Sequence, residues 1–169
     1  LAKVGAGTLT LSGNSSYSGG TTVGAGTLAV TGTNSATGAI TVNGGTLSVA
    51  ANWNNAGNVT INNGGTLTIT SGGLYRTAAG ADAYNSYTVT VNAGGTLNLA
   101  SFAYNGDGGL GGNRDYGQSR VLAGGTLNIT GATQTSYQDF YVANGSSGTF
   151  NMTTAGQTLT LAGNGNSNI

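Results

Sequence analysis

The sequence lacks most of the side chains that carry out acid–base and nucleophilic chemistry. Its 169 residues include no cysteine, histidine, glutamate or proline, and charged residues make up only 5% of the chain. Soluble domains usually contain roughly 25% charged residues. Without histidine, cysteine and glutamate, most pairs of a nucleophile and its general base cannot be assembled. The composition therefore disfavours an enzyme, and no cofactor is expected.

The small number of charges also limits the partners. Four basic and four acidic residues give a net charge of zero, so the chain has no electrostatic footprint for nucleic acid or for an anionic membrane. No run of about 18 apolar residues is present, so we predict no direct membrane insertion by this segment. The chain begins and ends within a repeating pattern, without a signal peptide or an initiator methionine. We therefore expect a piece of a longer protein.

Glycine is abundant, with 33 residues, and a Gly-Thr-Leu phrase recurs along the chain. The spacings between successive copies are 19, 19, 20, 30, 30 and 23 residues, and such self-similarity near 20 residues is typical of a solenoid. The two longer intervals predict loop insertions of ten residues, at 70–88 and 100–120. The apolar residue of the phrase stands at Leu9, Leu28, Leu47, Leu67, Leu97, Leu127 and, in a degenerate copy, Phe150.

A second phrase rich in β-branched residues precedes each Gly-Thr-Leu, at 21–23, 40–42, 59–61 and 89–91. Glycine and asparagine separate the two phrases, and both residues tolerate the backbone of a tight turn. Each unit thus predicts a strand, a turn and a second strand, with alternate apolar residues pointing inward. Stacking equivalent strands at roughly 4.8 Å buries these residues. The sequence predicts an all-β, right-handed parallel β-helix with rungs of about 19–20 residues, forming a single segment over 1–169.

The inward set comprises two residues in each second strand and one or two in each first strand. In the second strands these are Leu9, Leu11, Leu28, Val30, Leu47, Val49, Leu67, Ile69, Leu97, Leu99, Leu127 and Ile129; in the first strands they are Val23, Ile40, Val42, Val59, Ile61, Val89 and Val91.

Residues 3–30, KVGAGTLTLSGNSSYSGGTTVGAGTLAV, resemble the autotransporter passenger-associated β-strand repeat. The matching positions include Lys3, the Gly-Thr-Leu of both copies, Asn14 and Tyr17. The resemblance is full over 1–30, residues 31–169 keep the Gly-Thr-Leu frame, and 153–166 are similar to the start of another copy. The resemblance implies a secreted β-helical stalk, displayed extracellularly or on the outer surface of a Gram-negative-type bacterium.

Other readings of the Gly-rich insertion at 100–120 stay open. Asp107 and Asp115 are the only carboxylates close enough in sequence to act as a glycosidase pair, which requires roughly 5–9.5 Å between them. A flexible insertion is a poor place to hold such a geometry. Asn105, Asp107, Asn113 and Asp115 also offer oxygen ligands for calcium. They are equally consistent with turn residues that bond their own backbone, so no metal site is assigned.

The outward threonines raise the possibility of an ice-binding array, which requires Thr-x-Thr in successive turns. Residues 8–10 and 66–68 comply, but 27–29, 46–48, 96–98 and 126–128 do not. The interrupted pattern is instead typical of a solvated β-face.

Tyrosine and arginine are concentrated in the second half of the chain, mainly in the two insertions. These residues favour recognition surfaces because they combine contact area with hydrogen bonding, and long loops on a regular scaffold often carry binding residues. Tyrosines that fold back over the flank are the alternative. The candidate partner-binding residues are Tyr75, Arg76, Tyr84, Tyr104, Arg114, Asp115 and Tyr116. Their expected partner is a host or matrix glycan or protein.

The sequence thus favours a structural and adhesive segment over an enzyme. A β-helix ends in open strand edges, and no cap is visible at either end of this sequence. Self-association through these ends into a head-to-tail fibre is therefore the alternative function.

Overall fold

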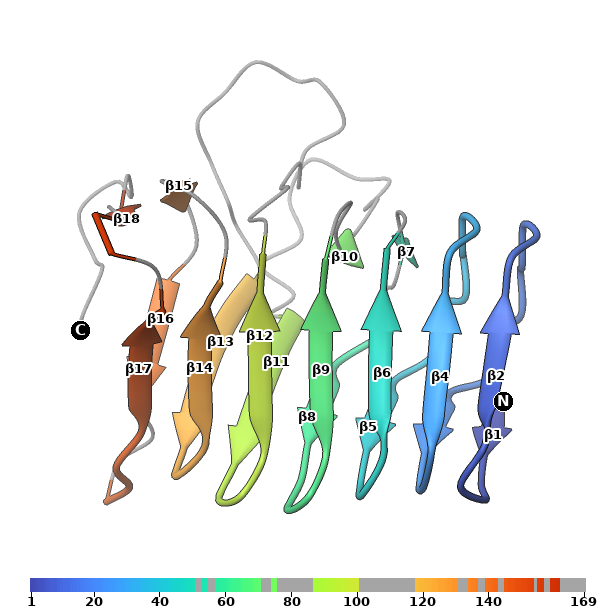
Figure 1. Ribbon diagram of the computed structural model, residues 1–169, viewed down its shortest axis with the longest axis horizontal. Helices are drawn as coiled ribbons and strands as arrows, with labels where there is room; N and C mark the ends of the chain where they lie inside the picture. The colour runs from blue at the N-terminus through green and yellow to red at the C-terminus, as the bar shows by residue number, and fades with distance from the viewer. Residues whose placement is uncertain are drawn as a thin grey trace.

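The computed structural model describes residues 1–50, 53–54, 57–70, 74–75, 87–100, 118–130, 134–136, 139–142, 145–153, 155–156 and 159–161. Within this part of the chain all regular structure is β-strand, arranged in two long sheets and two short pairs. Each rung contributes one strand to each long sheet, and the rungs follow one another along the long axis in sequence order (Figure 1).

The two long sheets contain seven strands each. We call them sheet A and sheet B. Sheet A runs β1 (Ala2–Lys3), β3 (Thr21–Val23), β5 (Ile40–Val42), β8 (Val59–Ile61), β11 (Tyr87–Asn92), β13 (Gln118–Ala123) and β16 (Asp139–Val142). Sheet B runs β2 (Thr8–Leu11), β4 (Thr27–Val30), β6 (Thr46–Val49), β9 (Thr66–Ile69), β12 (Thr96–Leu99), β14 (Thr126–Ile129) and β17 (Thr149–Met152). The short pairs are β7 (Trp53–Asn54) with β10 (Leu74–Tyr75), and β15 (Gln134–Ser136) with β18 (Leu159–Leu161).

Every pair of neighbouring strands is parallel and keeps one register. Leu9 pairs with Leu28, Leu28 with Leu47, and the column continues through each Gly-Thr-Leu copy to Phe150. The predicted parallel β-helix is confirmed. The two 30-residue intervals leave this register unchanged, since Leu97 pairs with both Leu67 and Leu127. The additional residues therefore fall, in the sequence, between Thr70 and Tyr87 and between Ala100 and Gln118.

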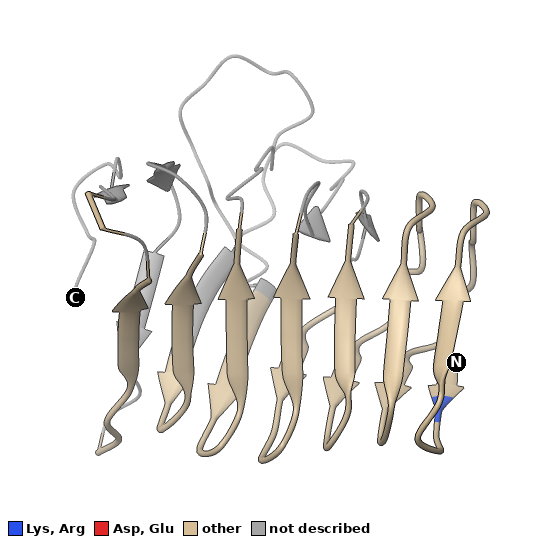
Figure 2. Cartoon of the chain, viewed as in Figure 1, with Lys and Arg blue, Asp and Glu red and all other residues tan. Residues whose placement is uncertain are grey.

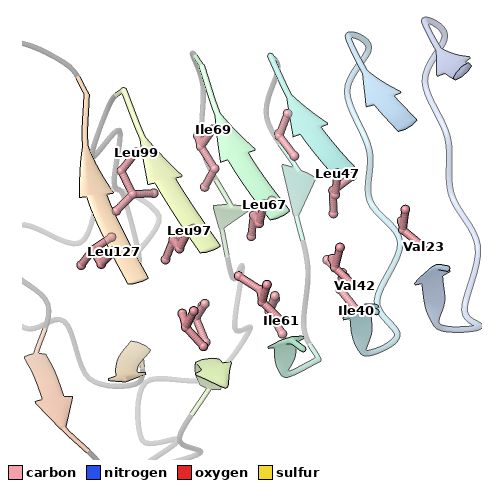
Figure 3. Close-up of a cluster of buried hydrophobic side chains, with 14 of the residues drawn as sticks. Val23, Ile40, Val42, Leu47, Ile61, Leu67, Ile69, Leu97, Leu99 and Leu127 are labelled. Carbon is pink, nitrogen blue, oxygen red and sulfur yellow. The ribbon is translucent and has the colours of Figure 1, made fainter. Parts of the chain in front are cut away.

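The core is the space between sheets A and B, and the inward residues fill it (Figure 3). In the five middle strands of sheet B, half-buried and buried residues alternate, as the period of two predicts. Burial of a Val, Leu or Ile side chain contributes about 1.5–3 kcal/mol. The buried set contains all of the predicted inward residues except Leu9 and Leu11, and it adds Ala36 and Leu122.

Leu9 and Leu11 are the exception. Both occupy the inward register of sheet B, but Leu9 is 38% exposed and Leu11 is only half-buried. Their strand, β2, has a neighbour on one side only. The inward position was predicted correctly, and the incomplete burial follows from the place of the strand at the end of the stack.

In every rung after the first, the glycine of Gly-Thr-Leu is required by the close stacking of rungs. A Cβ on Gly95 would come within 2.6 Å of the Ile61 carbonyl oxygen, and one on Gly45 within 2.7 Å of the Gly26 carbonyl oxygen. At Gly65 it would collide with the Val42 carbonyl oxygen. A side chain at this corner would therefore push neighbouring rungs apart.

Candidate functional site

The outer face of sheet B repeats the same polar groups along the axis. Its first column consists of threonine in every rung, paired in register and half-buried in the five middle rungs. The column is Thr8, Thr27, Thr46, Thr66, Thr96, Thr126 and Thr149. Threonine is favoured here because its branched side chain packs well on a pleated surface. The face offers hydroxyl groups to a partner, but it carries no group that titrates near neutral pH.

An asparagine ladder runs beside the threonine column over the last four rungs. The Nδ2 of Asn98 donates to Thr68 Oγ1 at 3.1 Å, Asn128 donates to Asn98 Oδ1 at 2.8 Å, and Asn151 donates to Asn128 Oδ1 at 2.8 Å. Every bond points from one rung to the preceding one. The amide groups therefore bond one another along the axis, and the ladder holds the rungs in register.

A second ladder lies at the corner between the two sheets. Asn62 donates to Asn43 Oδ1, and Asn92 donates to Asn62 Oδ1, each at 2.7 Å. These asparagines directly follow the inward residues Val42, Ile61 and Val91, where the chain leaves sheet A. These hydrogen bonds connect the turns of successive rungs, whose side chains lie outside the core.

Lys3 occupies an unexpected position in sheet A. It pairs with Val23, so it lies in the inward column that continues through Val42, Ile61 and Val91. Its side chain is only 6% exposed. The Nζ atom donates to the carbonyl oxygens of Gly5 at 2.7 Å, Val4 at 3.0 Å and Ala25 at 3.1 Å. The ammonium group thus uses its three donors on two successive turns, while its stem takes the place of an apolar residue.

Lys3 is the one charged side chain in the described side-chain ranges, 1–50, 57–70, 88–100, 122–130, 145–153 and 155–156. Figure 2 shows it at the end of the molecule where β1 lies. Its contacts are all with backbone carbonyls, so in this arrangement it stabilises turns. The repeat frame could have identified Lys3 as an inward residue, because Lys3 precedes Leu9 by the same six residues that separate Ile61 from Leu67.

A buried asparagine stands out near the N-terminal end. Asn34 is fully buried, and its Oδ1 accepts a hydrogen bond from the Ala36 N–H at 2.8 Å. Its Nδ2 atom has no hydrogen-bond partner. Within the described part of the chain this nitrogen is therefore a buried donor without a partner, which is rare in folded proteins.

Most of the predicted partner-binding residues lie outside the described residues: Arg76, Tyr84, Tyr104, Arg114, Asp115 and Tyr116. Tyr75 is placed by its backbone in β10, where it pairs with Asn54 of β7. The possible calcium ligands and the Asp107–Asp115 pair also lie outside this part of the chain. These assignments remain predictions.

The described residues contain no group of three or more His, Cys, Asp or Glu side chains that could hold a metal ion. They also contain no helix long and apolar enough to cross a membrane.

Comparison with known families finds a similarity over the N-terminal rungs. Residues 1–30 and 24–49 match the family model described as Passenger-associated-transport-repeat. The first 49 residues are thus similar to the passenger-associated-transport repeat. No curated protein and no solved structure matches the chain. The matched family is a passenger repeat and not a known catalytic family.

The residues that define the passenger-associated repeat have structural roles in the β-helix. Leu28 and Val23 are fully buried in the core. Gly26 adopts a φ of 65°, and a Cβ there would come within 2.7 Å of Lys3 Nζ. The Tyr17 hydroxyl bonds the Thr21 hydroxyl at 2.7 Å, and the Tyr17 ring packs against the core. The segment that matches the repeat most fully thus forms a rung of the β-helix.

Proposed function

We propose that the chain is a non-catalytic structural and adhesive segment of a secreted or cell-surface bacterial protein, an autotransporter-like passenger stalk that presents loops. The observation that carries this proposal is the register of sheet B. It passes unchanged across both 30-residue intervals, from Leu67 to Leu97 to Leu127. A scaffold that accepts ten extra residues twice without a shift in strand pairing is suited to displaying variable segments.

The stacking itself supports a mechanical role. Each rung repeats the same backbone hydrogen bonds and buries the same column of apolar residues, so stability accumulates along the axis. The described side chains offer one charged group, Lys3, and it is occupied by three carbonyl oxygens. This supports an action by contact over an action by acid–base chemistry.

We assign the adhesive contacts to the insertions at 70–88 and 100–120. Tyr75, Arg76, Tyr84, Tyr104 and Tyr116 belong to these segments, and aromatic and arginine side chains dominate many binding interfaces. The partner we propose is a host or matrix glycan or protein. The outer face of sheet B, whose polar side chains are threonine, serine and asparagine, is the weaker candidate.

Binding of the purified chain to a glycan array and to immobilised matrix proteins tests this proposal. We expect a ligand whose binding falls at least tenfold in the Tyr104→Ala/Tyr116→Ala variant. The matched control is Tyr17→Phe, which removes a hydroxyl group from the scaffold and leaves both insertions intact, and it should bind as the wild type does. No ligand, or one bound equally by both variants, would contradict the assignment to the loops. Release of reducing sugars from a polysaccharide would instead indicate an enzyme.

A further inference from the structure

Two turns between sheets A and B contain the same reactive pair, an asparagine followed by a glycine. Asn43 and Gly44 follow β5, and Asn63 and Gly64 lie in the turn after β8 (Figure 1). All four residues are exposed. The backbone nitrogen of the glycine can attack Cγ of the preceding side-chain amide, because glycine has no Cβ to block the approach. The surroundings of each turn therefore decide which pair reacts.

The next rung holds both reacting groups of the Asn63 turn. The Gly64 N–H donates to the Gly94 carbonyl oxygen at 3.0 Å. The Asn63 side chain lies against the same glycine, since a Cβ on Gly94 would collide with Asn63 Oδ1. Attack by the Gly64 nitrogen would require this hydrogen bond to open first, and bonded amides react only through such openings. This pair is therefore protected.

The Asn43 turn lacks this protection. Within the described residues the Gly44 N–H has no hydrogen-bond partner. Asn43 Oδ1 accepts a hydrogen bond from Asn62 Nδ2 at 2.7 Å, while no described group bonds Asn43 Nδ2. A donor on the carbonyl oxygen favours attack at the carbon, because it stabilises the negative charge that develops there. The attacking nitrogen and the leaving nitrogen are thus both free.

The difference between the two turns comes from their lengths. Three residues separate β5 from β6, whereas four separate β8 from β9. The four-residue turn is followed in the next rung by a matching turn, between Asn92 and Thr96, which contains Gly94. The three-residue turn is followed by a longer one. Gly64 therefore reaches a carbonyl in the next rung, and Gly44 does not.

We propose that Asn43 is a site of spontaneous deamidation in the folded protein, with Gly44 as the attacking residue. The Gly44 nitrogen bonds to Cγ of Asn43 and gives up its proton. The bond from Cγ to Nδ2 breaks, and Nδ2 leaves with that proton as ammonia. Water then opens the cyclic imide at either carbonyl carbon, which leaves aspartate or isoaspartate at position 43. This modification goes beyond the proposed adhesive function and does not depend on it.

The aspartate product fits the turn. Its carboxylate can accept the hydrogen bond that Asn62 gives to Asn43, and a bond to a charged acceptor is stronger. Lys3 is the one charged side chain in the described side-chain ranges, so no carboxylate among them repels the new charge. Deamidation thus adds a negative charge to a corner that had none.

The isoaspartate product does not fit, because the main chain then runs through the side-chain carbon and the turn gains one backbone atom. The turn is closely stacked, since a Cβ on Gly45 would come within 2.7 Å of the Gly26 carbonyl oxygen. The Asn43 N–H also donates to the Val23 carbonyl at 2.8 Å. We expect the longer turn to weaken these contacts and to lower the unfolding temperature.

Peptide mapping by mass spectrometry of the purified 169-residue chain tests the site. During incubation of the folded chain, Asn43 should lose its amide at least tenfold faster than Asn63, the internal control. In urea the two should react at similar rates, because unfolding removes the bond to Gly94. Equal rates in the folded chain, or an unreacted Asn43, overturn the proposal. The further Asn-Gly pairs, at 105–106, 144–145 and 164–165, each include a residue outside the described part and give separate peptides.

The products and the pH dependence test the chemistry. The rate at Asn43 should rise with pH, because the attacking nitrogen must lose its proton, and isoaspartate should form. Aspartate alone at every pH would indicate direct hydrolysis and overturn the role of Gly44. Asn43→Gln keeps a side-chain amide but forms a larger ring more slowly, so it should stay unmodified there while Asn63 reacts as before. Asn43→Asp should unfold at the wild-type temperature, unlike the isoaspartate fraction.

Hydrogen exchange read by NMR tests the structural cause independently of the reaction. The Gly44 amide should exchange at least tenfold faster than the Gly64 amide, which is bonded to Gly94. Glycine in both positions, each after an asparagine, makes the two amides a matched pair. A Gly44 amide protected as well as that of Gly64 would overturn the proposal.

Discussion

At the scale of single residues, Lys3 is the clearest case of a side chain whose role depends on its neighbours. Its column is apolar in the rungs that follow, and a charge there would normally be costly to bury. The cost is offset because the ammonium group reaches the carbonyls of Val4, Gly5 and Ala25. The long stem spans the distance from the core to the turn, which no shorter cation could do.

Replacement of Lys3 by methionine separates the contribution of the stem from that of the charge. Methionine keeps an apolar stem in the column but leaves three carbonyls without their donor. We expect the free energy of unfolding to fall by about 1–2 kcal/mol, near the lower end for hydrogen bonds to charged groups, because Val4 and Gly5 are exposed and their carbonyls can bond water. Urea denaturation measures the change, with Val4→Thr as a control. A more stable Lys3→Met variant would show that burying the charge costs more than its bonds contribute.

A second residue-scale prediction concerns the glycine at the corner of a middle rung. In Gly95→Ala the new Cβ would come within 2.6 Å of the Ile61 carbonyl oxygen. Relieving this contact requires a backbone shift in two rungs, so we expect a loss of about 1–3 kcal/mol in the free energy of unfolding. Thermal and urea unfolding measure it. An unchanged stability would mean that the rungs are spaced more loosely than the structure shows.

At the scale of elements, the Asn98–Asn128–Asn151 ladder holds neighbouring strands of sheet B by their side chains. Asn128→Ala removes one bond given to Asn98 and one received from Asn151. Each net bond contributes about 0.5–1.5 kcal/mol, and partial exposure favours the lower end, so we expect a total loss of about 1–2 kcal/mol. Asn128→Thr should lose less, because a hydroxyl can accept from Asn151 as Thr68 accepts from Asn98. Equal losses in the two variants, measured by denaturation, would argue against the ladder.

The elements also show what the sequence could and could not predict. The alternation of apolar residues and the Gly-Thr-Leu frame predicted the strands and the inward residues. This was sufficient because similar rungs in a stack place equivalent side chains in the same environment. Leu9 follows the same period but is exposed, since burial depends on a neighbouring rung that a local pattern does not describe. Lys3 also lies in an inward column, but the prediction of inward residues from apolar side chains did not include it because it is charged. The residues proposed in the loops, such as Arg114, follow no period, so nothing in the sequence fixes their arrangement.

At the scale of the whole molecule, stability is expected to vary along the axis. Each rung contacts only its neighbours, so the middle rungs are held from both sides and the end rungs from one. Parts of a protein with fewer contacts open more readily, and their amides exchange faster. We expect the N–H of Thr66 and Thr96, bonded to Gly45 and Gly65, to exchange more slowly than that of Thr149, in the last rung. Hydrogen exchange read by mass spectrometry resolves these segments.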